Sequence, residues 1–95
     1  MATSDAIGNI QSIEAGSSLD VKPTAPAEWI VHNIYVPEDQ AAEIYFTDGT
    51  NPILIATISG SYLGYFFHAT ATRYISIKNT SGSAMKIGYD GIAVK

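Results

Sequence analysis

Two histidines are the residues of this sequence whose side chains most readily do chemistry. His32 lies in the segment EWIVHNIYV and His68 in YLGYFFHAT, so both stand in aromatic stretches. Histidine is a common general base and metal ligand, and the two rings could meet if their strands were neighbours. A site also needs a third ligand or a nucleophile, and neither histidine has an H-x-H partner or an acidic residue at ligand spacing. We therefore interpret both as packed or interface residues.

The other patterns with chemical potential are weaker still. Most serines lie in turn clusters, and no G-x-S-x-G elbow is present. Glu38 and Asp39 are adjacent in a loop, which favours a solvated surface over a glycosidase pair. The DGTN segment at 48–51 lacks the spacing of a calcium loop, so we interpret it as a turn. The sequence has no cysteine. It therefore predicts a protein that is not an enzyme and that holds no cofactor or metal.

Aromatic side chains offer a binding alternative. The ten of them are Trp29, Tyr35, Tyr45, Phe46, Tyr62, Tyr65, Phe66, Phe67, Tyr74 and Tyr89. Exposed rings could stack sugars or bases, whereas buried ones fill cores and interfaces. Their positions in period-two strands favour packing. A carbohydrate-binding module stays open as an alternative, and it requires two or three coplanar exposed rings among Trp29, Tyr45, Tyr62 and Tyr65.

The composition narrows the class of partner. The 95 residues make one domain, and only 15% are charged, below the roughly 25% of an average soluble domain. The net charge is -4 and the five basic residues form no run, which argues against nucleic-acid binding. No apolar run approaches the roughly 20 residues of a membrane span. The first 11 residues lack the features of a signal peptide, so we expect a protein made in soluble form without a membrane partner.

Short strands separated by turn residues account for most of the chain. The expected strands span 7–15, 17–23, 28–36, 43–47, 52–58, 62–70, 73–79, 84–90 and 91–95. A helical turn could begin at Pro37, and the last two strands are expected to be hinged or bulged at Gly88 and at Asp90-Gly91. The strand spacing of roughly 8–12 residues is typical of a sandwich or barrel. We predict a single antiparallel β-sandwich over 11–95, jelly-roll-like, with an immunoglobulin-like sandwich or small barrel as alternatives. Residues 1–10 are expected to form a flexible N-terminal arm.

Three of these strands, 28–36, 52–58 and 62–70, carry apolar residues on both faces. A sheet of a two-layer sandwich has one inner face, and monomers rarely expose large apolar patches. We therefore expect a homo-oligomer, unless loops such as 22–27 cover the second face. In EWIVHNIYV we expect one row, Trp29, Val31 and Tyr35, to fill the sandwich and the other row to face a second subunit. The candidate interface residues are Ile30, His32, Ile34, Tyr65 and Phe67.

Several segments also resemble a known group of proteins. The strand EWIVHNIYV, the DGTN turn, the YFFH segment and the closing NTSGSAMKIGYDGI are similar to small structural proteins of tailed bacteriophages. The resemblance covers about residues 12–95 and concerns fold more than activity. It implies a non-enzymatic virion component, made in the host cytoplasm, and best read as a capsid decoration (cement) protein. Such a protein binds the major capsid protein on the outer surface of the head, often as a trimer. Virion proteins of the tail, including receptor-binding modules, are the alternative.

Overall fold

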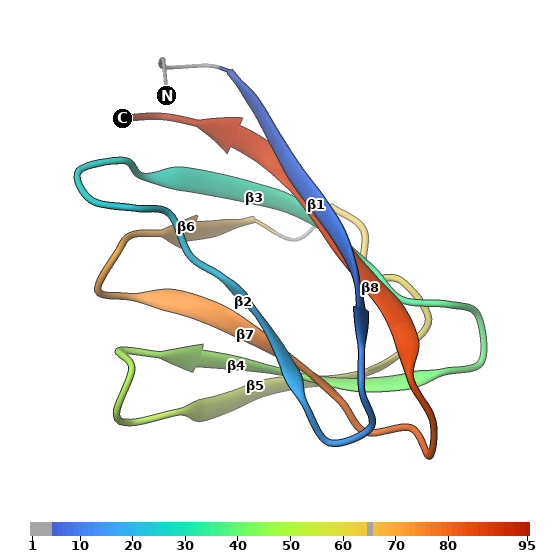
Figure 1. Ribbon diagram of the computed structural model, residues 1–95. Helices are drawn as coiled ribbons and strands as arrows, with labels where there is room; N and C mark the ends of the chain where they lie inside the picture. The colour runs from blue at the N-terminus through green and yellow to red at the C-terminus, as the bar shows by residue number, and fades with distance from the viewer. Residues whose placement is uncertain (1–4, 65) are drawn as a thin grey trace.

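The computed structural model describes residues 5–64 and 66–95, and these form two antiparallel four-stranded sheets stacked face to face (Figure 1). The strands are β1 (Ala6–Ile13), β2 (Ser18–Val21), β3 (Trp29–Tyr35), β4 (Ala41–Thr47), β5 (Ile53–Ser59), β6 (Phe67–Ala69), β7 (Tyr74–Asn79) and β8 (Met85–Ala93). We call the sheet with order β1-β8-β3-β6 sheet A and the sheet with order β2-β7-β4-β5 sheet B. The β-branched and aromatic residues that fill these strands suit a pleated surface with one face buried.

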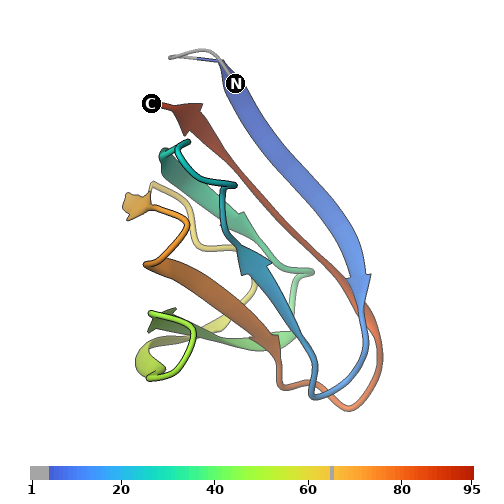
Figure 2. The ribbon, with the colours of Figure 1, turned by 60° about the vertical axis from the view of Figure 1, so that its left-hand side comes forward.

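The strand order is that of a jelly roll. Successive strands pass from one sheet to the other, and only β4 and β5 follow each other within one sheet, joined by the predicted turn at 48–51. Figure 2 shows β1 (blue) and β8 (red) running side by side along the right-hand side of the molecule. Two sheets of four strands in this order make the double Greek key of jelly-roll domains. The predicted antiparallel, jelly-roll-like sandwich is therefore confirmed, and the alternatives of an immunoglobulin-like order and a barrel are wrong.

The core lies between the sheets and consists mostly of isoleucine and valine. The side chains with the least solvent exposure include Val21, Val31, Ile34, Ile44, Ile75, Ile77 and Ile87. They come from both sheets, and in a regular strand such as β7 they alternate with outward-facing residues, here Ser76 and Lys78. Burying one such side chain contributes roughly 1.5–3 kcal/mol relative to leaving it exposed. This core holds the two sheets together, and their outer faces are left for contacts with solvent or with other molecules.

A β-bulge in β3 changes which of its residues face the core. Val31 pairs with Gly91 and Asn33 with Asp90, so His32 is the extra residue on β3. A bulge reverses the alternation of side chains beyond it. Trp29 and Val31 therefore point inward before it, and Ile34 points inward after it. The predicted rows of this strand were wrong, because Ile34 is fully buried and Tyr35 is exposed.

Other features that the sequence predicted, mostly at the chain ends, also differ from the structure. Residues 6–10, expected in a flexible arm, are part of β1 and pair with β8; residues 1–4 lie outside the described part of the chain. The two expected C-terminal strands are one strand, β8, and the irregularity expected at Asp90-Gly91 is in β3 opposite them. Gly91 is needed there because a Cβ atom would overlap the Ile30 carbonyl oxygen. No helix forms after Pro37 in the described chain, where a short turn leads into β4.

Candidate functional site

The two histidines do not form a common site. His32 stacks on Phe66, with 4.9 Å between ring centroids. The His68 Nε2 atom lies 2.8 Å from Glu28 Oε1, and Lys95 Nζ lies 3.6 Å from the other carboxylate oxygen. The hydrogen bond to His68 is the main cause that lowers the pKa of Glu28. No group of three metal-ligating side chains occurs within residues 5–64 and 66–95. His32 thus has a ring contact with Phe66, and His68 has a surface hydrogen bond with Glu28.

Asp48 closes the turn between β4 and β5. Its carboxylate accepts hydrogen bonds from the backbone N–H groups of Asn51 and Thr50, at 2.8 and 2.9 Å. These two bonds stabilise the charged form and lower the pKa of Asp48 to about 2. The carboxylate is therefore used to hold the turn, which confirms the interpretation of DGTN as a turn.

A polar cluster organises the outer face of sheet A. Asp90 accepts hydrogen bonds from Asn33 Nδ2 at 2.8 Å and from the Tyr35 hydroxyl at 2.7 Å. The hydrogen bond to Asp90 is the main cause that raises the pKa of Tyr35. Asn33 also accepts a hydrogen bond from the Gly64 N–H through its side-chain oxygen, at 2.9 Å. The cluster therefore ties the segment between β5 and β6 to the surface of β3.

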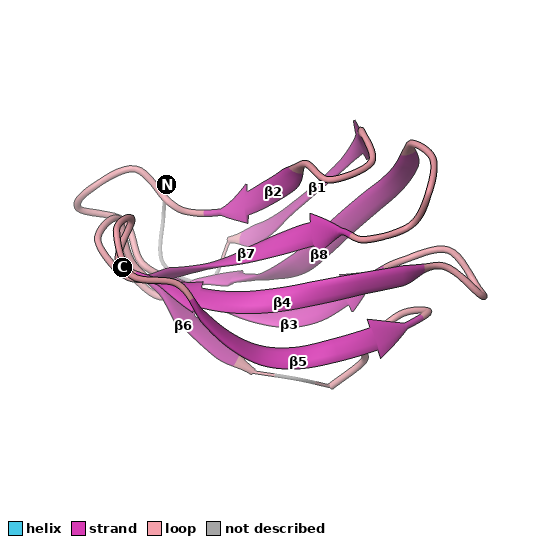
Figure 3. Ribbon diagram, turned by 90° about the horizontal axis from the view of Figure 1, so that it is seen from below, coloured by secondary structure: helices cyan, strands magenta, loops and turns pink. Residues whose placement is uncertain are grey.

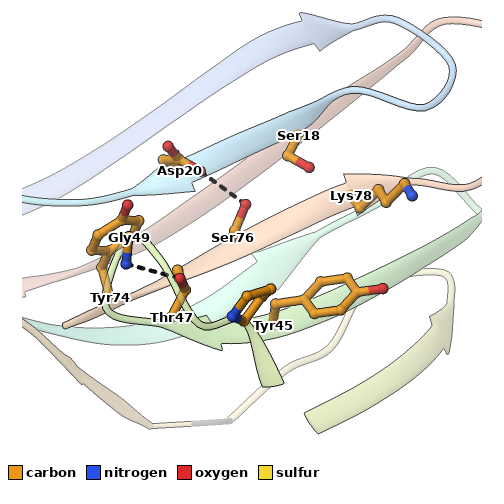
Figure 4. A pocket seen from close by; sticks show the side chains of 9 residues that line it. Ser18, Asp20, Tyr45, Thr47, Gly49, Tyr74, Ser76 and Lys78 are labelled. Atoms are coloured by element: carbon orange, nitrogen blue, oxygen red, sulfur yellow. Dashed lines mark hydrogen bonds between the residues drawn. The ribbon is translucent and has the colours of Figure 1, made fainter. Parts of the chain in front are cut away.

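A groove of about 440 Å³ lies on the outer face of sheet B (Figure 4). Strands β2, β7 and β4 contribute its side chains, including Asp20, Ser76, Lys78 and Tyr45. Figure 4 shows the Ser76 hydroxyl directed at Asp20, and the two atoms lie 2.8 Å apart. The Tyr45 hydroxyl donates to Glu43 at 2.8 Å, and this bond is the main cause that raises the tyrosine's pKa. The groove thus combines an aromatic ring with neutral and charged hydrogen-bonding groups.

Exposed apolar side chains gather on the side of the sandwich where β5 and β6 are the outermost strands of their sheets. We call this surface the apolar edge, and it consists of Phe46, Ile53, Leu54, Ile55, Leu63 and Phe66. Figure 3 shows β5 and β6 on the same side of the molecule. The exposed fraction is 61% for Ile53, 64% for Leu63 and 70% for Phe66. Apolar residues scattered singly are ordinary on a surface, but six exposed large apolar side chains on one side of a small domain make this side a candidate interaction surface.

The apolar edge arises because β5 is an edge strand with apolar residues on both faces. Ile53 pairs with Phe46 on the inner face, and Leu54 pairs with Tyr45 on the outer face. A bulge at Ile55 separates this half of the strand from the half that contains Ala56 and Ile58. The latter two residues pack partly against the core, whereas the first half of β5 has solvent on both sides.

The expected interface residues are distributed over several environments. Ile34 and Phe67 are buried in the core of the monomer, so, contrary to the prediction, neither side chain is available to a second subunit. Ile30 and His32 are partly exposed on sheet A and stay candidates for an interface. Tyr65 lies outside the described residues. The sequence did predict that the strand at 52–58 has apolar residues on both faces, but Ile53, Leu54 and Ile55 were not named as interface residues.

The rings proposed for sugar stacking are also dispersed. Trp29 packs against the core and lies 6.1 Å from the Tyr89 ring, and Tyr62 is likewise packed against the core. Of the described members of that set, only Tyr45 lines the groove on sheet B. Trp29 and Tyr62 therefore do not belong to an exposed platform of rings, and Tyr65, the fourth member of the expected set, lies outside the described residues.

Comparison with known proteins gives no relative: no protein-family model and no curated protein matches this chain. Over residues 5–64 and 66–95, the structure also has no helix of the length and apolarity that would cross a membrane.

Proposed function

We propose that this protein is a non-enzymatic structural component of a tailed-bacteriophage virion. Its role is that of a capsid decoration protein, which binds the major capsid protein on the head surface and stabilises the shell as a homo-oligomer. The observation that carries the proposal is the apolar edge on an otherwise compact jelly roll. The resemblance of the segments EWIVHNIYV, DGTN and NTSGSAMKIGYDGI to small phage structural proteins supplies the link to a virion.

The energetics of the apolar edge support an assembly role. Exposing apolar surface costs roughly 25 cal/mol per Å² relative to burying it. Ile53, Leu54, Leu63 and Phe66 each expose about half or more of their surface, and covering them would recover several kcal/mol before the cost of association. Jelly rolls also serve as capsid domains, which is an argument by fold analogy only.

The direct test is binding to capsids. Purified protein is mixed with expanded heads from a tailed phage that carries the gene, after the gene has been deleted. The proposal expects saturable co-sedimentation with the heads and a higher temperature of shell disruption. A matched variant, Leu63→Ser with Ile53→Ser, should bind more weakly while keeping the native fold. If the protein stays in the supernatant at every concentration and the heads of the deletion mutant are fully stable, the decoration role is refuted.

A second candidate function is recognition of a glycan receptor by a tail or fibre module. The observation that favours it is the groove on sheet B. Tyr45 provides a ring for the apolar face of a sugar, while Asp20, Ser76 and Lys78 provide hydrogen-bond acceptors and donors for its hydroxyl groups. Lectin domains also occur among jelly-roll proteins, which is an argument by fold analogy only.

The two functions make different predictions for the same variants. A glycan-array signal that disappears in Tyr45→Ala and in Asp20→Ala would favour the glycan receptor. The double variant Leu63→Ser with Ile53→Ser should leave such a signal unchanged, because Ile53 pairs with Phe46 on the inner face of sheet B and neither substituted residue lines the groove. An array without any signal would remove the glycan receptor candidate.

A further inference from the structure

The backbone of β5 has hydrogen-bonding groups that point away from the sheet. Gly60 N–H donates to the Gln40 carbonyl at 3.0 Å, and Ser59 and Thr57 pair with Ala41 and Glu43. In an antiparallel ladder the residues that bond to a neighbouring strand alternate with residues whose N–H and C=O point the other way. Gly60 bonds toward β4, so Ser59 and Thr57 direct their N–H and C=O groups outward, to the free edge. The strand is therefore a template for one more strand.

The four edges of the sandwich differ in how they discourage such pairing. Natural edges are protected by charge, proline or short length. β2 has Asp20 within it and is followed by Lys22 and Pro23, and β6 has only three residues. β1 is long and uncharged but exposes mainly polar side chains, Ile10 being its one large exposed apolar residue. β5 has seven residues, ILIATIS, with no charge and no internal proline, and its first three side chains are all exposed and apolar.

We propose that β5 pairs antiparallel with β5 of a second copy of this chain, extending sheet B across a twofold axis. This inference rests on the homo-oligomer of the proposed function and names its interface. Across a twofold axis a strand meets its own sequence in reverse, so any charge in it would lie near its own copy and be penalised. The sequence ILIATIS has no charge to be repelled, although the chain as a whole carries -4. A charged partner would find no complementary group on this strand, whereas a second copy offers the same uncharged apolar surface.

The apolar edge supplies the side-chain contacts of this pairing. A standard stable interface buries roughly 800 Å² on each partner, more than a single strand of seven residues provides. Phe46 extends the inner face beside Ile53, and Leu63 and Phe66 extend the surface along the edge of sheet A. In the proposed dimer these side chains add to the surface that the extra strand buries. This pairing closes at two copies, in place of the trimer that the resemblance implies.

The test measures the self-association of the 95-residue chain by sedimentation velocity over a series of protein concentrations. Thr57→Pro removes an outward N–H without breaking a bond to β4, and proline is compatible with a free edge. We expect its dimer dissociation constant to rise by about tenfold or more, equivalent to the loss of one to two strand hydrogen bonds. Thr57→Ala, which keeps the N–H, should dimerise like the parent chain.

A matched control lies on the other long edge. Ala93 N–H donates to the Asp5 carbonyl at 2.8 Å, so by the same alternation Ser12 directs its N–H outward from β1. Ser12→Pro should therefore leave the dimer unchanged. If Ser12→Pro dissociates the oligomer and Thr57→Pro does not, the β5 interface is refuted while the homo-oligomer of the proposed function stands. A parent chain that is monomeric at every concentration refutes both.

A second pair of variants guards against misfolding of the proline variant. Thr57→Lys and Thr57→Glu keep the backbone N–H but place like charges close together across the twofold axis. Each alone should associate about tenfold more weakly than the parent chain, and an equimolar mixture should recover a mixed dimer. Two variants that dimerise separately as tightly as the parent chain would overturn the proposal.

Discussion

Because of the bulge in β3, two isoleucines four residues apart lie in different environments, and their truncation should change the free energy of unfolding by different amounts. Ile34 is fully buried between the sheets, whereas Ile30 is partly exposed on the outer face of sheet A. The same truncation, isoleucine to alanine, removes the same three carbon atoms at both positions. Any difference in the free energy of unfolding therefore reports the environment and not the chemistry of the change.

The burial of each side chain determines how much free energy of unfolding its truncation should cost. Truncating a fully buried isoleucine costs about 2–5 kcal/mol, which combines lost transfer energy with the cavity left behind. For Ile34→Ala we expect about 3 kcal/mol, a large share of the roughly 5–14 kcal/mol that a domain of this length has in total. With about 4–8 °C per kcal/mol, Tm should fall by roughly 12–24 °C. For Ile30→Ala we expect about 1 kcal/mol or less.

The assay is urea unfolding followed by the fluorescence of Trp29, the single tryptophan of the chain. All three proteins are compared at one protomer concentration, because association of the native state would add to apparent stability. Equal losses for the two variants, or a larger loss for Ile30→Ala, would refute the bulge and restore an uninterrupted alternation along β3.

Three further outcomes follow from the structure. Gly91→Ala should cost more than about 3 kcal/mol or prevent folding, because the new Cβ overlaps the Ile30 carbonyl oxygen; a soluble variant with native Tm would contradict this. Asp48 is charged in the folded turn down to a pKa of about 2, below its ordinary 3.8, so its contribution to stability is present above that ordinary value and lost as pH falls toward 2. Acid titration of Asp48→Ala should accordingly show a flatter loss of stability over that interval, and an unchanged slope would exclude the carboxylate as its cause. Asn33→Ala should speed hydrogen exchange at the Gly64 amide, its hydrogen-bond partner, with little change in global stability; unchanged exchange would mean that the bond does not hold the segment.

The sequence predicts the sandwich well because its local signals agree with one another. The DGTN turn lies between two apolar strands, and β7 shows clean alternation, with Ile75 and Ile77 inside and Ser76 outside. Such patterns depend only on near neighbours along the chain. The bulge at His32 gives no comparable signal, because EWIVHNIYV has apolar residues in both rows and either phase would bury a plausible set.

The surfaces were harder to predict than the core because they depend on contacts between distant segments. The hydrogen bond between Glu28 and His68 joins residues 40 positions apart, and the groove on sheet B takes its side chains mainly from three strands. The apolar run at 52–58 did indicate that some surface needs covering. Only the strand order reveals that this run is an edge, where both the side chains and the outward backbone groups of Thr57 and Ser59 are open to a partner.

Assembly through β5 is tested most directly by hydrogen exchange of the unmodified chain, measured residue by residue at low and at high protein concentration. If the jelly roll assembles through β5, the amides of Thr57 and Ser59 should exchange more slowly as concentration rises, because they become hydrogen-bonded to a second copy. The outward amides of β1, such as that of Ser12, should keep one rate throughout. Unchanged exchange at Thr57 and Ser59, with concentration-dependent protection elsewhere, would contradict assembly through β5.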